Sequence, residues 1–247
     1  MPSDDVAAPW IRRVDPRAHK RLFCLPYAGG GAAAFKGWTD CLPATVDVCP
    51  VVLPGREHRM REPAVADLRA LAEGLATAIK PLVRRAPYAV YGHSMGSWLG
   101  FELVRALRRR RLPLPEHLYV GARRAPHLPA THPPLSHLER DAFVAGVQER
   151  YNAIPAALLA QPAILDMFLP TLKADFGALD AYRYQEEEPL DVPITAFRGA
   201  RDAVVASSAL RAWSEHTTAG FQQHTLPGGH FFLDEDRDLL TSLVGTY

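Results

Sequence analysis

Long apolar runs and an excess of charge are both missing from this sequence. No run of about 18 or more apolar residues occurs among its 247 residues, which argues against a membrane-spanning helix. Residues 1–9 contain two aspartates and no apolar stretch, so they do not resemble a signal peptide. The formal net charge is +1, which gives no reason to expect nucleic acid or an anionic membrane as a partner.

Cysteine is scarce as well. The three cysteines, Cys24, Cys41 and Cys49, are an odd number and lack the spacing of a metal site. This pattern favours reduced, mostly buried thiols in a cytoplasmic protein. Because Cys24 and Cys49 lie in segments expected to be buried strands, neither is predicted to be a nucleophile.

Short apolar segments alternate with helical patterns along the chain. This alternation predicts an α/β fold with a mostly parallel sheet and helices on both faces, in one domain covering residues 1–247. From residue 65 onward, leucines at helical spacing predict a helix before the third strand. The predicted strands are residues 21–26, 46–53, 88–91, 117–121, 193–199 and 221–226.

Residues 124–188 interrupt this alternation. They contain several helical segments and no convincing strand, which is typical of a helical lid inserted into an α/β sheet. Ser136 and Glu139 fit a capping box and predict a helix that ends at about Tyr151. An apolar stripe at helical spacing follows, formed by Ile164, Phe168, Leu172, Phe176 and Leu179. The stripe packs against the core or lines an acyl channel, and both interpretations stay open for different residues.

A serine bracketed by glycines follows the third predicted strand. Residues 92–96 are Gly-His-Ser-Met-Gly and fit G-x-S-x-G, the nucleophile elbow of α/β-hydrolases. The backbone of so sharp a turn is strained, so the positions two before and two after Ser94 must lack bulky side chains. The alternative, a turn without chemistry, is disfavoured by the strand before it and the helix after it.

Two further residues complete a candidate catalytic triad. Asp202 follows the predicted strand at residues 193–199, and His230 follows the one at residues 221–226. Serine, then aspartate, then histidine, each after a strand, is the order of the triad in α/β-hydrolases. In such a triad the histidine takes the serine proton and the carboxylate orients the histidine. His93 adjoins Ser94, so we expect it to pack beside the triad rather than act as the base.

Two other features carry alternatives. A glycine-rich loop at residues 27–31 follows the first strand and offers backbone N–H groups to a ligand, while the GK[ST] ending of a phosphate loop is absent. Four consecutive arginines, Arg108–Arg111, end the helix after Ser94. They form either a solvated helix end that complements the helix dipole or a docking patch for an acidic protein.

Five motifs together resemble one family, and the match runs from about Lys20 to Leu240. They are residues 25–30 (Leu-Pro-Tyr-Ala-Gly-Gly), 53–56 (Leu-Pro-Gly-Arg), 92–96 (Gly-His-Ser-Met-Gly), 123–127 (Arg-Arg-Ala-Pro-His) and 227–232 (Pro-Gly-Gly-His-Phe-Phe). The chain resembles the type II, editing thioesterases of polyketide and nonribosomal peptide biosynthesis, including antibiotic biosynthesis. One departure is residues 151–155, where the family often has a glycine pair, and this puts lid flexibility and substrate size in question.

The resemblance implies a function and a site. It implies a serine thioesterase that hydrolyses acyl groups from the phosphopantetheine arm of acyl or peptidyl carrier proteins and so clears stalled synthases. It also implies that the backbone N–H groups of Ala28 and Met95 form the oxyanion hole. No metal or other cofactor is implied, and we expect a monomer. Because carrier proteins are generally acidic, Arg108–Arg111 or the pair Arg123 and Arg124 are candidate contacts.

Three alternatives use the same residues. A carboxylesterase or lipase has the same triad, and an acyltransferase passes the acyl group to an alcohol or amine instead of water. A binding module on a hydrolase scaffold is disfavoured because a binding role gives no reason to keep a complete triad.

Overall fold

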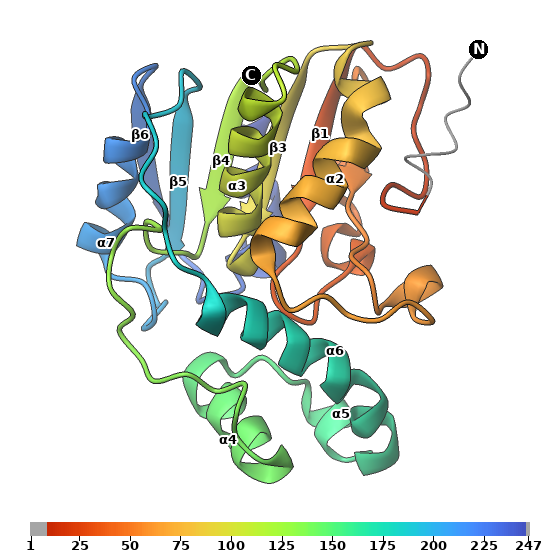
Figure 1. Ribbon diagram of the computed structural model, residues 1–247, viewed down its shortest axis with the longest axis vertical. Coiled ribbons are helices and arrows are strands. Elements are labelled where there is room, and N and C mark those ends of the chain that lie inside the picture. The colour runs from red at the N-terminus through yellow and green to blue at the C-terminus, as the bar shows by residue number, and fades with distance from the viewer. Residues whose placement is uncertain (1–8, 246–247) are drawn as a thin grey trace.

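Six parallel strands form one sheet in the computed structural model, which describes residues 9–245. The strand order is β2-β1-β3-β4-β5-β6 (Figure 1). All six predicted strands are confirmed, with ends that shift by a few residues at most. They are β1 (Lys20–Leu25), β2 (Val46–Pro50), β3 (Tyr88–His93), β4 (His117–Gly121), β5 (Ile194–Gly199) and β6 (Phe221–Leu226). The expectation for residues 1–8 lies outside the described part of the chain.

Helices cover both faces of the sheet, as predicted. On one face, α2 (Leu68–Val83) and α3 (Met95–Arg109) lie side by side across the strands (Figure 1). The opposite face is covered by α1 (Trp38–Cys41), α8 (Phe232–Glu235) and α9 (Arg237–Val244), whose apolar side chains form a second core cluster. Shorter elements connect them, namely α7 (Ser207–Arg211) and the 3-10 helices Ala32–Phe35, Glu57–Arg59 and Ala212–His216. The sheet is therefore buried on both sides, which explains why every residue of β3 is buried.

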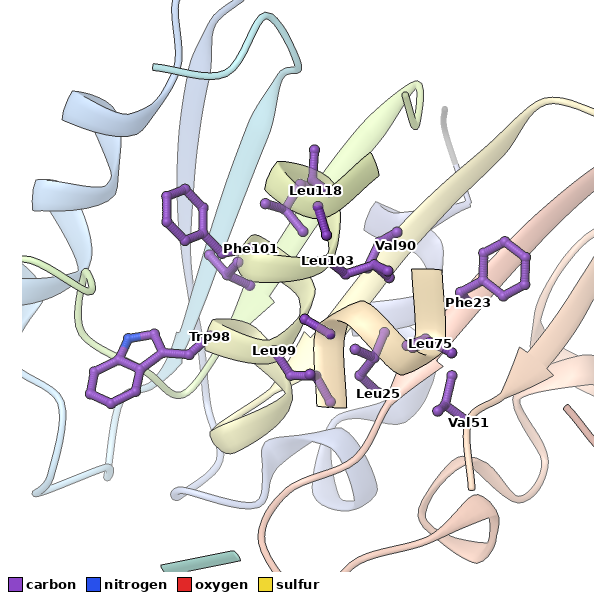
Figure 2. Close-up of a cluster of buried hydrophobic side chains, with 14 of the residues drawn as sticks. Phe23, Leu25, Val51, Leu75, Val90, Trp98, Leu99, Phe101, Leu103 and Leu118 are labelled. Atoms are coloured by element: carbon purple, nitrogen blue, oxygen red, sulfur yellow. The ribbon is translucent and has the colours of Figure 1, made fainter. Parts of the chain in front are cut away.

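The larger core lies between the sheet and helices α2 and α3. Leu75 of α2 and Leu99 of α3 point onto the strands, where they meet Phe23, Val90 and Leu118 (Figure 2). All five side chains are fully buried. Full burial of such a side chain stabilises the fold by roughly 1.5–3 kcal/mol. This packing fixes α3, the helix that follows Ser94, on the strand that precedes it.

Some predicted helix starts are wrong. α2 begins at Leu68 rather than near residue 65, because Asp67 caps it by accepting hydrogen bonds from the N–H groups of Arg69 and Ala70. The capping box predicted at Ser136 does not form. Instead α4 (Arg140–Tyr151) begins four residues later, and the Ser136 N–H donates to the Asp180 carboxylate. The sequence also favours Ser207 or Ser208 as the cap of the helix after β5, but Ala206 precedes α7 and makes no side-chain cap bond, so this prediction is wrong.

Residues 124–188 contain three helices: α4, α5 (Ala156–Leu159) and α6 (Pro162–Ala181). These helices lie together beyond one end of the sheet (Figure 1). They share a small apolar cluster of their own, formed by Phe143 and Val147 of α4 with Leu165, Leu169 and Phe176 of α6. Asn152 ends α4 with φ 47°, a left-handed conformation that glycine adopts most easily and asparagine tolerates. That this segment acts as a lid stays a prediction.

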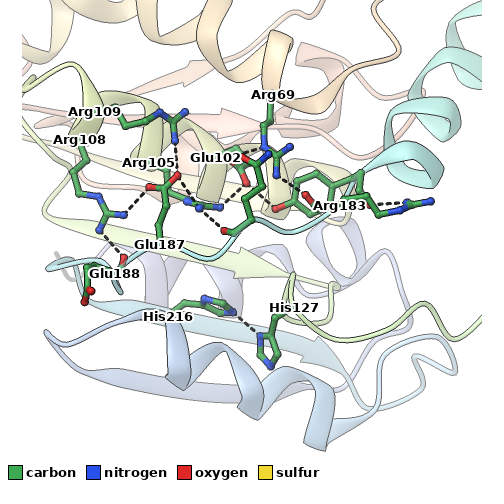
Figure 3. A network of polar contacts seen from close by, with 12 residues as sticks. Arg69, Glu102, Arg105, Arg108, Arg109, His127, Arg183, Glu187, Glu188 and His216 are labelled. Carbon is green, nitrogen blue, oxygen red and sulfur yellow. Dashed lines mark hydrogen bonds and ion pairs between the residues drawn. The ribbon is translucent and has the colours of Figure 1, made fainter.

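Three of the arginines at the end of α3, Arg108, Arg109 and Arg110, form ion pairs within the chain. Arg108 and Arg109 contact the Glu187 carboxylate at 2.9 Å (Figure 3). Arg109 and Arg110 contact the Glu73 carboxylate at 2.8 and 2.6 Å. Glu73 belongs to α2, so these pairs connect the end of α3 with α2 and with the segment that leads into β5. This arrangement differs from the simple solvated helix end considered from the sequence.

The cysteines follow the prediction in part. All three are free, Cys24 and Cys49 are buried in β1 and β2, and Cys41 is exposed. Within residues 9–245, the helices are all too short or too polar to cross a membrane.

Candidate active site

Ser94 lies at the turn between β3 and α3. Its backbone has φ 52° and ψ −109°, a strained conformation for a residue with a side chain. A Cβ at Gly92 would lie 2.1 Å from the Gly96 carbonyl oxygen, and one at Gly96 would lie 2.2 Å from that of Leu25. Glycine is therefore required at both positions. This confirms the prediction from the sequence that residues 92 and 96 must lack bulky side chains.

The structure brings Ser94, His230 and Asp202 together at the carboxyl ends of β3, β6 and β5. The Ser94 hydroxyl donates to His230 Nε2 at 3.1 Å, and His230 Nδ1–H donates to Asp202 Oδ2 at 2.9 Å. All three are at most 9% exposed. Parallel strands place their carboxyl ends at one edge, so residues 108 and 28 positions apart in the chain meet there.

Asp202 is held as a carboxylate by its surroundings. Burial acts to raise its pKa, but the hydrogen bond from His230 and those from the backbone N–H groups of Val204 and Val205 outweigh it, so the pKa lies below its usual value. Val204 N–H donates to the second carboxylate oxygen at 2.8 Å. Both oxygens of Asp202 are thus engaged, and its negative charge stays directed at His230.

His93 lies behind the triad and contacts the backbone of His230. Its Nε2–H donates to the His230 carbonyl oxygen at 2.8 Å, while its Nδ1 accepts from the Tyr91 hydroxyl at 3.0 Å. Burial, together with the nearby His230, lowers the pKa of His93 to about 3, so its ring is neutral. This contact fixes the loop that carries His230, in agreement with the packing role expected for His93.

Ala28 and Met95, the two expected oxyanion donors, both lie next to Ser94. Met95 is the first residue of α3, where a backbone N–H has no acceptor within the helix. Ala28 follows β1 and lines the same small pocket as Ser94 and His230. The positive end of α3 also faces this pocket.

A buried ion pair holds the loop that carries Ala28. The Arg56 guanidinium makes two hydrogen bonds to the Asp175 carboxylate at 2.8 and 2.7 Å. The same carboxylate accepts the Gly29 N–H at 2.7 Å, and Arg56 donates to the Gly30 carbonyl at 2.8 Å. Helix α6, which contains Asp175, is thereby joined to the loop beside Ser94.

Sequence reasoning did not identify this brace. Arg56 stood in one of the quoted motifs, but Asp175 is 119 residues away and belongs to a helix with no distinctive pattern. Tyr151 was also missed as a site residue. Its ring centre lies 5.1 Å from that of His230, and it lines the serine pocket.

Two larger cavities flank the serine pocket. One, of about 790 Å³, is lined largely by apolar residues of α6 and of the segments at residues 27–34 and 55–64, and it shares Ala28 and Leu172 with the serine pocket. The other, of about 470 Å³, lies on the side of Tyr151 and contains several arginines. Of the predicted apolar stripe, Phe168 and Leu172 line the first cavity, whereas Phe176 and Leu179 belong to core clusters and Ile164 is exposed. The stripe therefore divides between lining a cavity and forming a core.

No group of three or more His, Cys, Asp or Glu side chains in residues 9–245 is arranged to hold a metal ion.

Comparisons with known proteins agree with this geometry. A family model described as a thioesterase domain matches residues 20–247. Linear gramicidin dehydrogenase LgrE of Brevibacillus parabrevis is 40% identical, over 94% of this chain and 89% of its own. Thioesterase PikA5 of Streptomyces venezuelae is 34% identical, over 92% of this chain and 80% of its own.

A solved structure is similar over almost the whole chain. RedJ, a thioesterase from the prodiginine pathway of Streptomyces coelicolor, superposes with a TM-score of 0.86 at 39% identity, covering 95% of this chain and 89% of its own. The fold, the matched family model and these relatives lead to one conclusion. The chain belongs to the thioesterase family and has the α/β-hydrolase fold.

Proposed function

We propose that this thioesterase removes acyl groups from the phosphopantetheine arm of acyl or peptidyl carrier proteins, and so edits a polyketide or nonribosomal peptide synthase. The observation that carries the proposal is the hydrogen-bonded chain Ser94–His230–Asp202 beside an apolar cavity large enough for an acyl group. Relatives from such pathways, RedJ and PikA5 among them, support the same substrate class.

The proposed reaction has two halves. His230 Nε2 takes the Ser94 proton as the hydroxyl oxygen attacks the thioester carbonyl carbon. The N–H groups of Ala28 and Met95 bind the resulting oxyanion, each contributing about 3–4 kcal/mol in comparable sites. The C–S bond then breaks, and the pantetheine sulfur leaves with the proton from His230.

Water completes the cycle. His230 removes a proton from a water molecule, whose oxygen attacks the acyl-serine carbonyl. The tetrahedral intermediate collapses with return of that proton to Ser94, and the free acid departs. Asp202 keeps the histidine in the required tautomer and stabilises its cation in both halves.

A dehydrogenase, the activity in the name of LgrE, finds little support in this chain. The glycine-rich loop after β1 leads into the four-residue 3-10 helix Ala32–Phe35. A dinucleotide site would instead need a long helix there, whose N-terminus faces the pyrophosphate.

The function is tested with acetyl- and longer acyl-carrier-protein thioesters, incubated with the wild type or with Ser94→Ala and followed by intact mass. We expect loss of the acyl group with the wild type only. Intact acyl-carrier protein combined with cleavage of p-nitrophenyl esters would instead indicate a carboxylesterase. Acyl transfer to an added alcohol or amine, in place of the free acid, would indicate an acyltransferase.

The proposal extends to partners and location. A phosphopantetheinylated carrier protein is the partner, and the enzyme acts as a monomer in the cytoplasm. Size-exclusion chromatography with light scattering tests the monomer, since a mass of twice 27.2 kDa would contradict it.

A further inference from the structure

The cavity on the Tyr151 side of the serine pocket is strongly basic. Four arginines line it, Arg123, Arg124, Arg150 and Arg183, and Asp180 is the acidic residue among its lining. The Asp180 carboxylate already accepts the N–H groups of Leu135 and Ser136. The cavity thus carries a surplus of positive charge, although the chain as a whole is nearly neutral.

Arg123 and Arg124 form the inner wall of this cavity. Both guanidinium groups stack on the ring of Trp98, with their central carbons 3.8 and 4.8 Å from its centre. Within residues 9–245 neither forms an ion pair with a carboxylate, and Nε of Arg123 is buried without a hydrogen-bond partner. The Arg124 guanidinium donates instead to the Leu128 carbonyl oxygen.

Two adjacent cations without a counter-ion repel each other. Burial, together with the charge of Arg123, lowers the pKa of Arg124 to about 10. Elsewhere in this protein the buried Arg105 and the partly buried Arg108 have glutamate partners (Figure 3). Arg123 and Arg124 instead face the cavity, where a bound anion could take the position of the glutamate.

The basic cavity leads to the reacting atoms. Tyr151, Phe176 and Leu179 line both this cavity and the serine pocket. Arg123 lies against the Tyr151 hydroxyl, and the Tyr151 ring lies beside His230. An anionic group held at Arg123 is therefore separated from the triad by about one side chain.

We propose that Arg123 and Arg124 form an anion-binding subsite that holds a phosphate or carboxylate group of the thioester substrate. The inference rests on the proposed function, because the anion must belong to the molecule whose thioester lies at Ser94. Two parts of such a substrate carry this chemistry: the phosphate of the phosphopantetheine arm and a carboxylate on the acyl group itself. Guanidinium groups bind both through paired N–H donors.

Three small thioesters distinguish the two sources. Isovaleryl-pantetheine carries no anion, isovaleryl-4′-phosphopantetheine carries the phosphate, and malonyl-pantetheine carries a carboxylate of nearly the same shape as the isovaleryl branch. In the wild type we expect kcat/KM for one anionic substrate to exceed that for the neutral one about 10-fold, through a lower KM. In Arg124→Gln this ratio falls to about 1, whereas the exposed control Arg17→Gln keeps it.

The outcomes separate the alternatives. An advantage for the phosphate substrate alone assigns the subsite to the arm, and an advantage for the malonyl substrate alone assigns it to the acyl group. Equal kcat/KM for all three substrates in the wild type overturns the proposal, as does a ratio that Arg124→Gln leaves unchanged.

A binding measurement is independent of catalysis. In Ser94→Ala we expect 4′-phosphopantetheine or malonate, at constant ionic strength, to raise the midpoint temperature of thermal unfolding. This increase should disappear when Arg124→Gln or Arg150→Gln is combined with Ser94→Ala. Arg124→Gln and Arg150→Gln serve here because Arg123, which lies closer to Trp98 and has a buried Nε, is the more tightly packed of the two stacked arginines, and its replacement risks misfolding. A midpoint that neither anion raises overturns the subsite. Failure of the proposed function looks different, since the wild type would then cleave none of the thioesters while the anion still binds.

Discussion

Ser94 combines an unusual backbone with a reactive side chain. Its positive φ lifts the hydroxyl away from the sheet toward His230, and the two flanking glycines make that turn possible. At the scale of single residues, the nucleophilic attack expected from the sequence depends on the conformation of Ser94.

We expect Ser94→Ala to lose labelling by a serine-directed fluorophosphonate and to lower thioester kcat by about 10³-fold or more, since no other group can form the acyl-enzyme. Labelling is read by mass spectrometry of the peptide that contains residue 94. Ser242→Ala, at an exposed position of α9, should label as the wild type does. Retained labelling of that peptide in Ser94→Ala would exclude Ser94 as the nucleophile.

His93 makes the stability of the protein dependent on pH. Its pKa is about 3 in the folded protein and about 6.5 when unfolded, so below pH 6.5 the unfolded chain binds a proton that the folded protein does not. The free energy of unfolding therefore decreases on acidification across this interval. From pH 7.5 to 5.5 the contribution of His93 is about 1.4 kcal/mol.

Urea denaturation at these two pH values measures the effect. In His93→Gln we expect the decrease in unfolding free energy to be smaller than in the wild type by about 1.4 kcal/mol, because glutamine does not titrate. The exposed control His19→Gln should show the full wild-type decrease. An equal decrease in His93→Gln and the wild type would mean that His93 is not buried as a neutral ring.

At the scale of elements, the brace between Arg56 and Asp175 joins α6 to the loop after β1. We expect Asp175→Asn to reduce the free energy of unfolding by about 3–5 kcal/mol, because it leaves a buried guanidinium without its counter-charge. We also expect kcat to fall about 10-fold or more at a temperature where circular dichroism shows the variant folded, since the Ala28 N–H adjoins the loosened Gly29.

Arg140→Gln is the matched control for Asp175→Asn. Arg140 forms exposed ion pairs with Asp141 and Asp166 on the same group of helices, and such pairs contribute less than about 1 kcal/mol. If Asp175→Asn lost stability but kept the wild-type kcat, the brace would have a purely structural role.

The strands and the order of the triad could be predicted because both depend on local patterns. A fully buried parallel strand is a continuous apolar run, as in β3, and the glycines around Ser94 follow from the turn itself. The start of α4 could not be predicted in this way. Ser136 had the local pattern of a cap, but the distant Asp180 takes its N–H and leaves the helix to begin at Arg140. Contacts between segments far apart in the chain, including the Arg56–Asp175 brace, leave no local pattern.

At the scale of the whole molecule, the net charge is close to zero, but two groups of arginines differ in whether they have carboxylate partners. Arg108, Arg109 and Arg110 at the end of α3 have carboxylate partners on other segments, while the arginines beside Tyr151 have none within the described residues 9–245. We therefore expect Arg109→Glu with Arg110→Glu to leave the KM for an acyl-carrier protein, and its salt dependence, unchanged. A raised KM that is less sensitive to salt would show that this surface docks the carrier protein after all.

One cavity beside Ser94 is lined by arginines and the other mainly by apolar residues, and this difference restricts how a substrate can be oriented. A molecule that is charged at one end and apolar at the other can lie across the triad in only one orientation without placing hydrocarbon among arginines or charge among leucines. A triglyceride, apolar at every end, has no such orientation. Discrimination against such lipids would then require neither a steric clash nor a second hydrolytic site. It follows from the different free energies of placing hydrocarbon in the basic cavity and in the apolar cavity.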